Sequence, residues 1–271
     1  MRLTNKLKQL QQNRSSLLAT NYYNYETLRG ILQAASELNT PIILQLTKSS
    51  IDYMGLKVAV EMGRAALKEY NVEGWIHLDH SDSYELVQRC LDTGFDSVMI
   101  DASEKPIAEN IELTRRVVQL AARYDANVEA ELGYVAKLGQ SKEKVGFTDP
   151  EEAKYFVEET GVNALAVAIG SAHGFYKDEP KLDIERLARI NEVANAALVL
   201  HGGSGIPVPA LKEAIKNGIC KINLATEIKN IFIATLKNCF ADKDEIDLRI
   251  LFPPAIQAVK NLVKDKLTAI A

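Results

Sequence analysis

The sequence predicts a single (β/α)8 barrel, or TIM barrel, with an extra helix at its C-terminal end. Its 271 residues are close to the roughly 250 that are typical of this barrel. Short apolar runs alternate with amphipathic stretches along the chain, and strict alternation of this kind indicates a parallel sheet. Eight strand candidates can be counted, which is the number that closes a TIM barrel.

The predicted strands are apolar and often β-branched, as expected of strands that are buried on both faces. In chain order they are Ser16–Tyr22, Pro41–Leu46, Trp75–Asp79, Ser97–Asp101, Val128–Leu132, Ala164–Ile169, Ala197–His201 and Lys221–Leu224.

Helical patterns lie between these strands. Asp149 stands before Pro150 and two glutamates, a combination that favours the start of a helix. The predicted helices are Tyr25–Leu38, Leu56–Tyr70, Tyr84–Thr93, Ile107–Tyr124, Asp149–Thr160, Ile184–Ala194, Val208–Asn217 and Thr226–Cys239. A last helix, Pro254–Ala269, follows the barrel and is expected to cover one end of it or to meet another subunit.

No low-complexity linker interrupts this pattern, so residues 1–271 are predicted to form one domain. The competing architecture is an open doubly wound sheet, which would place a glycine-rich phosphate turn after its first strand. The segment Asn21–Glu26 contains no glycine, which favours the barrel.

Composition excludes several classes of protein. The net charge of −4 argues against a nucleic-acid partner, and no apolar stretch reaches the roughly 18 residues of a membrane span. Met1–Gln12 lacks the apolar core of a secretory signal. Cys90, Cys220 and Cys239 form no Cys-x-x-Cys pair, so they are expected to be reduced and buried in a cytoplasmic protein.

Polar residues stand at the C-terminal ends of the predicted strands, where barrel enzymes carry their functional residues. One such residue means little, because strand ends are exposed to water. A polar residue at the end of all eight strands, converging on one barrel mouth, predicts a site there. In chain order these residues include Asn21, Asn24, Thr47, Ser49, Asp79, His80, Asp101, Glu131, His173, His201, Asn223 and Thr226.

Three of the four histidines, His80, His173 and His201, follow the third, sixth and seventh strands. Each alone would be interpreted as a hydrogen-bonded histidine. Together at one barrel end they favour a metal, since three imidazoles and one open position are a common catalytic zinc arrangement. His77 should point to the same side of its strand as Asp79, and we interpret it as a core residue or a support for the ligands.

Asp79, Asp101 and Glu131 lie in nearly continuous apolar surroundings, where a charge is costly unless it is paired or bound to metal. They are candidates for acid–base chemistry or for a second metal position. The alternative is a ring of ion pairs with lysines such as Lys221. Asp79 is the best catalytic candidate because it adjoins a predicted ligand, whereas Glu129 is expected to face the helix layer.

A phosphate site is predicted after the seventh and eighth strands, where barrel enzymes often bind phosphate through backbone N–H groups at a helix start. Gly202 and Gly203 allow close approach to the backbone, and Ser204 adds a hydroxyl donor. Asn223 and Thr226 would close the other side.

These same residues resemble the class II, metal-dependent aldolases of fructose bisphosphate and tagatose bisphosphate. The matching stretches are His77–His80, Ser97–Ser103, Val128–Gly133, Ala164–Gly174, Leu198–Gly205 and Lys221–Glu227. The resemblance implies reversible aldol cleavage of a ketose 1,6-bisphosphate, or a related ketose 1-phosphate. The products would be dihydroxyacetone phosphate and an aldehyde such as glyceraldehyde 3-phosphate.

The resemblance also assigns roles to individual residues. It implies that His80, His173 and His201 bind Zn²⁺ and that Asp79 is the acid–base group. It implies that Asp101 and Glu131 lie near a second position, for a divalent or a monovalent cation. It implies that the phosphate of dihydroxyacetone phosphate is surrounded by Gly174, Gly202, Gly203, Ser204, Asn223 and Thr226. Cleavage beside a carbonyl leaves an enediolate, which a Lewis acid can stabilise.

The loop after Glu131 departs from the family pattern. The family usually has two glycines followed by Glu-Asp there, and that glutamate moves the carbon-bound proton. In this chain residues 134–146 hold no acidic pair. Glu143 is the candidate replacement, and the alternative is a solvated loop charge.

Two other functions compete with the aldolase. One is a metal-dependent phosphosugar epimerase or isomerase, which would use the same metal and phosphate site, and the altered loop keeps it open. The other is a non-catalytic subunit of a larger complex. The expected partners are a phosphorylated sugar and further copies of the chain, in a homodimer or homotetramer, with no nucleic acid and no membrane.

Overall fold

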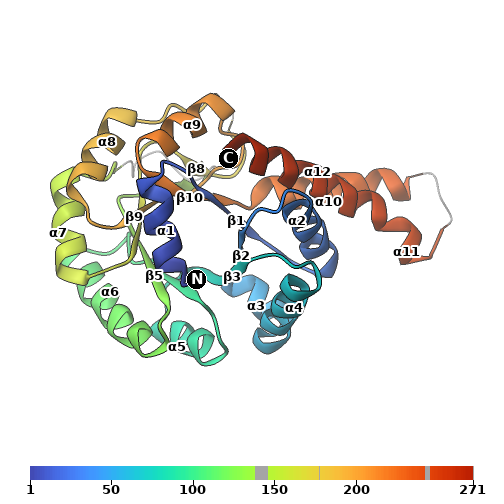
Figure 1. Cartoon of the computed structure of the whole chain (residues 1–271), viewed down its shortest axis with the longest axis horizontal. Helices are drawn as coiled ribbons and strands as arrows, with labels where there is room; N and C mark the ends of the chain where they lie inside the picture. The colour runs from blue at the N-terminus through green and yellow to red at the C-terminus, as the bar shows by residue number, and fades with distance from the viewer. Residues whose placement is uncertain (138–145, 177, 242–244, 271) are drawn as a thin grey trace.

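Eight parallel strands close into a barrel in the computed structural model (Figure 1), which describes residues 1–137, 146–176, 178–241 and 245–270. These strands are β1 (Leu17–Asn21), β2 (Ile42–Thr47), β3 (Gly74–Ser81), β4 (Ser97–Ile100), β5 (Asn127–Leu132), β7 (Ala164–Val167), β9 (Ala197–Leu200) and β10 (Ile219–Leu224). Each pairs in parallel with its neighbours along the chain, and β1 also pairs with β10. All eight predicted strands are confirmed, with ends that differ by at most two residues.

Helices surround the barrel, as predicted. They are α2 (Tyr25–Glu37), α4 (Leu56–Glu69), α5 (Tyr84–Asp92), α6 (Ile107–Ala121), α7 (Pro150–Thr160), α8 (Ile184–Val193), α9 (Val208–Lys216) and α10 (Thr226–Phe240). The predicted cap of α7 is confirmed, because the Asp149 side chain accepts hydrogen bonds from the backbone N–H groups of Glu151 and Glu152. A short helix not expected from the sequence, α3 (Lys48–Met54), begins after β2 and is capped by Thr47.

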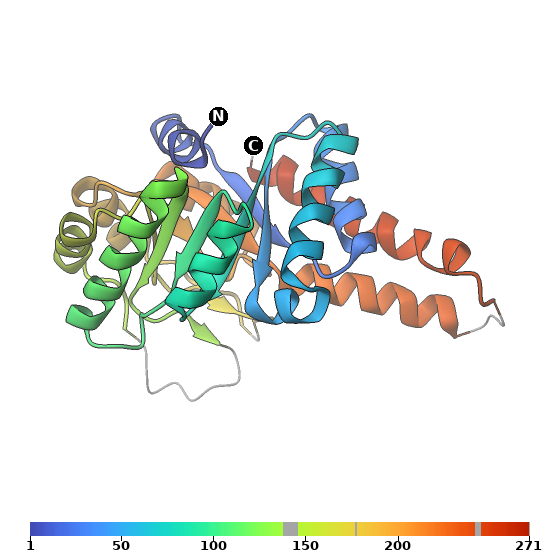
Figure 2. The same cartoon turned by 90° about the horizontal axis from the view of Figure 1, so that it is seen from below.

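An N-terminal helix, α1 (Leu3–Gln12), was not expected either. It lies across the N-terminal end of the barrel (Figures 1 and 2), where Leu3 and Leu7 are buried in a cluster with apolar residues of the barrel strands. Thr4 Oγ1 donates to Asn127 Oδ1, 3.1 Å away, at the start of β5. Because α1 closes this end, the C-terminal end is left for a site.

The predicted last helix is confirmed as α12 (Pro253–Ile270). It packs against α2 and α10. Figures 1 and 2 show α10 and α12 extending side by side beyond the barrel as an arm, with the short helix α11 (Leu248–Leu251) near its tip. Cys90 and Cys220 are buried as expected, but Cys239 on this arm is only half-buried.

Two short strands lie outside the barrel sheet. β6 (Ala136–Lys137) follows β5, and β8 (Ala172–His173) follows β7. The two pair in parallel, so the start of the loop after β5 is tied to the predicted ligand His173. Over the described part of the chain, no helix combines the length and apolarity that a membrane crossing requires.

Candidate active site

The end of β3 brings two adjacent residues, Asp79 and His80, to the same site. Side chains of neighbouring strand residues normally point to opposite faces. His80 has φ = 50°, in the left-handed region that non-glycine residues seldom adopt. The β3–β4 register also shifts here, since Leu78 pairs with Val98 but Ser81 pairs with Ile100. This bulge breaks the alternation, so that both side chains line one cavity.

The three predicted ligands converge at the C-terminal end of the barrel. The rings of His80, His173 and His201 have centroids 4.7 to 5.8 Å apart. Each offers one nitrogen, and these nitrogens lie within 4.8 Å of one another. The histidines come from three different strand ends, so the barrel geometry assembles a cluster that no local segment of the chain contains.

The other contacts of the rings direct nitrogens toward a common point. His80 Nδ1 lies 2.9 Å from an Asp101 oxygen, and His201 Nε2 lies 2.9 Å from Glu129 Oε1. His80 Nε2 and His201 Nδ1 are buried and have no hydrogen-bond partner. Buried nitrogens are seldom left in this way. Histidine ligands of metals usually hold a carboxylate through their second nitrogen, and these two residues fit that pattern.

Carboxylates surround the cluster. His80, Asp101 and Glu131 also have ligand atoms within 4.8 Å of one another, which brings together the residues predicted for a second cation. Glu131 Oε2 is buried without a hydrogen-bond partner although it lies only 2.9 Å from His201 Nδ1, because the two atoms are poorly aligned for a hydrogen bond. Two electron-rich atoms in this arrangement suit a cation that binds both.

The pKa of His201 reflects this negative surrounding. Burial opposes a charge on the imidazole, but the contacts with Glu129 and Glu131 outweigh burial and raise the pKa to about 10. With Asp79 and Asp101 nearby, four carboxylates gather around these histidines, and among the described side chains the ammonium of Lys221 pairs with one of them, Glu129. This excess of negative charge favours a divalent cation.

Asp79 has the surroundings of an ionised acid–base group. It is 5% exposed, and its Oδ2 accepts a hydrogen bond of 3.0 Å from Asn21 Nδ2. Burial would raise the pKa of the carboxyl, but the nearby His80 and His201 outweigh it and hold the pKa below its ordinary value. The amide of Gln45, a residue that the sequence analysis did not single out, is fully buried against the same carboxylate.

Most of the residues predicted for the phosphate share a cavity with Asp79 and two of the histidines. Those lining it are Gly174, Gly202, Ser204, Asn223 and Thr226. Helix α10 begins at Thr226 on this wall without a side-chain cap from Ala225, as expected where a helix N-terminus receives an anion. Gly203 lies behind the wall, since its N–H donates to the Asn223 carbonyl 3.0 Å away.

Tyr176 joins two of the loops that carry ligands, and sequence reasoning missed it. Its Oη accepts a hydrogen bond of 2.7 Å from the Ala172 N–H and donates one of 3.0 Å to the Gly202 carbonyl. Gly202 has φ = 67°, and a Cβ there would lie 2.3 Å from the Ala172 oxygen. The loops before His173 and after His201 can therefore approach each other only with glycine at position 202.

The expectation that Glu129 faces the helix layer is wrong. Its side chain is fully buried inside the barrel, where it contacts His201 and forms an ion pair of 2.7 Å with Lys221. Strand alternation explains this, because Glu129 and Glu131 are two residues apart and share one face of β5. Lys221 thus pairs with Glu129, and not with the three carboxylates considered from the sequence. His77 is also inside, hydrogen-bonded to Ser97 at 2.7 Å.

Glu143, the predicted replacement for the loop glutamate, lies outside the described residues. The loop leaves the barrel at Gly133 and returns at Gly146, whose carbonyl accepts a hydrogen bond of 2.9 Å from the Tyr134 N–H. Tyr134 and Gly146 are therefore held together.

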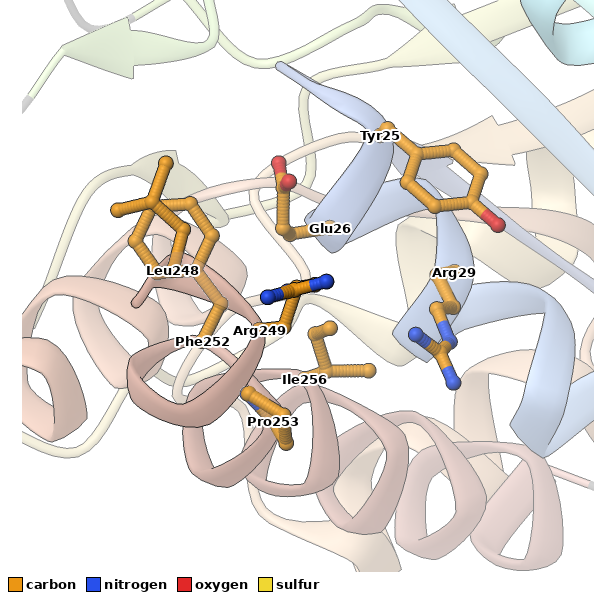
Figure 3. A pocket seen from close by; sticks show the side chains of 8 residues that line it. All are labelled: Tyr25, Glu26, Arg29, Leu248, Arg249, Phe252, Pro253 and Ile256. Atoms are coloured by element: carbon orange, nitrogen blue, oxygen red, sulfur yellow. The ribbon is translucent and has the colours of Figure 1, made fainter. Parts of the chain in front are cut away.

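A larger hollow of about 220 Å³ lies outside the barrel, against about 40 Å³ for the cavity at its mouth. Figure 3 shows the side chains that line it, which come from α2 and from the α11–α12 end of the arm: Tyr25, Glu26, Arg29, Leu248, Arg249, Phe252, Pro253 and Ile256. Glu26 is its one carboxylate, and none of these residues belongs to either metal-ligand cluster found among the described residues. Chemistry, and not size, therefore identifies the barrel mouth as the candidate active site.

Comparison with known proteins agrees with this geometry. In solved structures the chain is similar to the YdjI aldolase from Escherichia coli K12, with 31% identity over 99% of this chain and 96% of that one, and a TM-score of 0.89. It shares its fold with the fructose-bisphosphate aldolase of Campylobacter jejuni, at 19% identity over 99% and 93% of the two chains and a TM-score of 0.83. The family model for class II fructose-bisphosphate aldolase matches residues 1–271, and the chain belongs to this family.

Proposed function

We propose that this protein is a zinc-dependent aldolase that reversibly cleaves a ketose 1,6-bisphosphate, or a related ketose 1-phosphate. The products are dihydroxyacetone phosphate and an aldehyde such as glyceraldehyde 3-phosphate. One observation carries the proposal: three histidine nitrogens lie within 4.8 Å of one another, and two of these histidines line a cavity together with the buried carboxylate of Asp79. Zinc suits this donor set because it binds imidazole nitrogen and leaves a position open for substrate.

His80, His173 and His201 are the residues that would hold the ion. When bound, it supplies Lewis-acid stabilisation of the substrate carbonyl and hydroxyl oxygens. Asp101 contacts Nδ1 of His80, and Glu131 would help to bind a second cation. The unpartnered nitrogens of His80 and His201 support this assignment.

Asp79 carries the proton transfer at the departing aldehyde. In cleavage it accepts the proton of the substrate hydroxyl while the carbon–carbon bond breaks and the aldehyde carbonyl forms. In synthesis it returns that proton to the new hydroxyl. The hydrogen bond from Asn21 orients the carboxylate, and its lowered pKa keeps it in the accepting form at neutral pH.

The phosphate of the substrate binds in the same cavity as Asp79, among Gly174, Gly202, Ser204, Asn223 and Thr226. Two features support this. Glycine permits a close backbone approach, and the N-terminus of α10 adds the positive end of a 15-residue helix. Gly203 contributes by letting its loop pack on β10, since a Cβ there would lie 2.7 Å from the Asn223 oxygen.

Product analysis tests the reaction. Zinc-loaded protein is incubated with fructose 1,6-bisphosphate, tagatose 1,6-bisphosphate and ketose 1-phosphates, and the products are followed by NMR. We expect dihydroxyacetone phosphate and one aldehyde in equal amounts. A panel of aldehydes in the synthetic direction then identifies the second substrate. Formation of an isomeric sugar phosphate without carbon–carbon cleavage would favour the epimerase, and bound metal without any turnover would favour the non-catalytic subunit.

We also propose that the chain assembles with further copies of itself, as a homodimer or homotetramer. The arm exposes a series of large apolar side chains, 49% to 89% accessible: Ile233, Phe240, Ile246, Leu248 and Ile250. Exposed apolar side chains mark an interaction surface where they form a contiguous patch, and an element that projects from the barrel can reach a neighbouring subunit (Figures 1 and 2).

Light scattering coupled to size-exclusion chromatography tests the assembly. Ile233→Asp with Ile250→Asp is expected to shift the protein to monomers, because two charges would be buried in the interface. Val58→Asp on α4, where Val58 is 63% exposed, is the control and should leave the mass unchanged. A monomeric wild-type protein at micromolar concentration would refute the proposal.

A further inference from the structure

A buried polar cluster lies inside the barrel, beneath the three histidines. Glu129, Lys221 and His77 are each 0% exposed, as are Ser97 and the neighbouring ligand His201. The reaction proposed above uses neither Glu129 nor Lys221. Burying two charges in a barrel interior is costly, and apolar residues fill this layer in most TIM barrels. The cluster therefore calls for a functional reason.

Glu129 bridges the ligand and the lysine. Its Oε1 lies 2.9 Å from His201 Nε2, and its Oε2 lies 2.7 Å from Lys221 Nζ. A carboxylate accepts hydrogen bonds and does not donate them. His201 must therefore carry a proton on Nε2. Its other nitrogen, Nδ1, has no hydrogen-bond partner, although Glu131 Oε2 lies 2.9 Å away, and it is the nitrogen left for a metal.

Lys221 fixes the carboxylate in turn. Its Nζ also lies 3.5 Å from His77 Nε2, and His77 Nδ1 lies 2.7 Å from Ser97 Oγ. Asn127 Nδ2 donates to the same oxygen at 3.1 Å, and Asn127 accepts from Thr4 on α1. A continuous series of polar contacts thus runs from the candidate metal centre to the closed end of the barrel. Held on both sides, the Glu129 side chain has little freedom to turn.

We propose that Glu129 is a positioning residue: held by Lys221, it fixes His201 in the tautomer and orientation that presents Nδ1 to the metal. The proposal rests on the metal site proposed above. The role proposed for Glu129 concerns Nε2 of His201, the nitrogen that does not bind the metal. Glu129 itself does not belong to either group of candidate ligands.

Two double variants separate the hydrogen-bond acceptor from the buried charge. Both replace the ion pair, so that neither leaves an unpaired charge in the core. Glu129→Gln with Lys221→Met keeps an acceptor oxygen for His201. Glu129→Leu with Lys221→Met fills a similar volume without an acceptor. We expect the first to bind Co²⁺ within about fivefold of wild type. The second should bind about 10- to 100-fold more weakly, the usual effect of losing such a support.

Co²⁺ affinity is measured from the visible absorption of the bound ion in competition with a chelator, which requires no aldolase turnover. Thermal unfolding of each variant is recorded alongside. Thr160→Val is the control for stability alone, because Thr160 is a buried residue of α7 whose hydroxyl donates to the Phe156 carbonyl. It should lower Tm and leave Co²⁺ affinity unchanged.

The tautomer can be read without any variant. The chain has four histidines, so a long-range ¹⁵N–¹H NMR spectrum of the zinc-loaded wild type contains few histidine ring signals and is simple to assign. We expect His201 to be protonated at Nε2. Protonation at Nδ1, or equal Co²⁺ affinity of the two double variants, would overturn the role of Glu129 while leaving the metal site intact. Wild-type protein that binds no Co²⁺ or Zn²⁺ would overturn the metal site and this role together.

Discussion

Asp79→Asn is expected to lower kcat for aldol cleavage by about 10²- to 10⁴-fold, the usual contribution of a general acid–base group. Asparagine keeps the shape of the side chain, and its amide oxygen can still accept the hydrogen bond from Asn21. It cannot accept the proton of the substrate hydroxyl at neutral pH. The loss should therefore appear in turnover, while binding of the metal and of dihydroxyacetone phosphate changes little.

Steady-state kinetics and a zinc titration on the same preparation measure this split. Asp82→Asn is a suitable control, because Asp82 follows the same strand but is exposed to solvent. Its kcat should stay close to that of wild type. A loss of less than about threefold in Asp79→Asn would mean that the residue is structural, and a loss of metal with activity would mean that it supports the ligands.

His201→Ala should abolish metal binding and activity together. His201 is fully buried and offers one of three nitrogens, so its removal opens the coordination shell and leaves Glu129 and Glu131 without their shared partner. We expect zinc affinity to fall by more than the roughly 10- to 100-fold that loss of an outer support causes. Wild-type protein treated with a chelator should lose activity in the same way.

Metal content by mass spectrometry and activity before and after zinc addition provide the measurement. Zinc should restore the chelated wild type and leave His201→Ala inactive. Circular dichroism at the assay temperature establishes that the variant is folded. If the variant kept full activity in chelator-treated buffer, the histidine cluster would not be the catalytic metal site.

The sequence by itself determined the barrel. Strands that are buried on both faces are apolar along most of their length, so the polar residues at their C-terminal ends stand out. In a parallel barrel those ends converge. His80, His173 and His201 could therefore be assigned to one site although 93 residues separate the first two. The alternation of side chains along a strand also predicts the side on which Glu129 lies. Glu129 is two residues from Glu131 and shares its face, so the sequence analysis could have placed it inside the barrel.

Only the tertiary structure decided how the site is arranged. Asp79 and His80 point to one cavity because β3 bulges against β4, and a bulge arises from pairing between strands that local sequence does not specify. Contacts between separate loops likewise revealed Tyr176, and the hydrogen bond to Asn223 placed Gly203 behind the cavity wall. Residue types and strand ends are local properties of the chain, whereas the direction of a side chain and its partners depend on register and packing between distant segments.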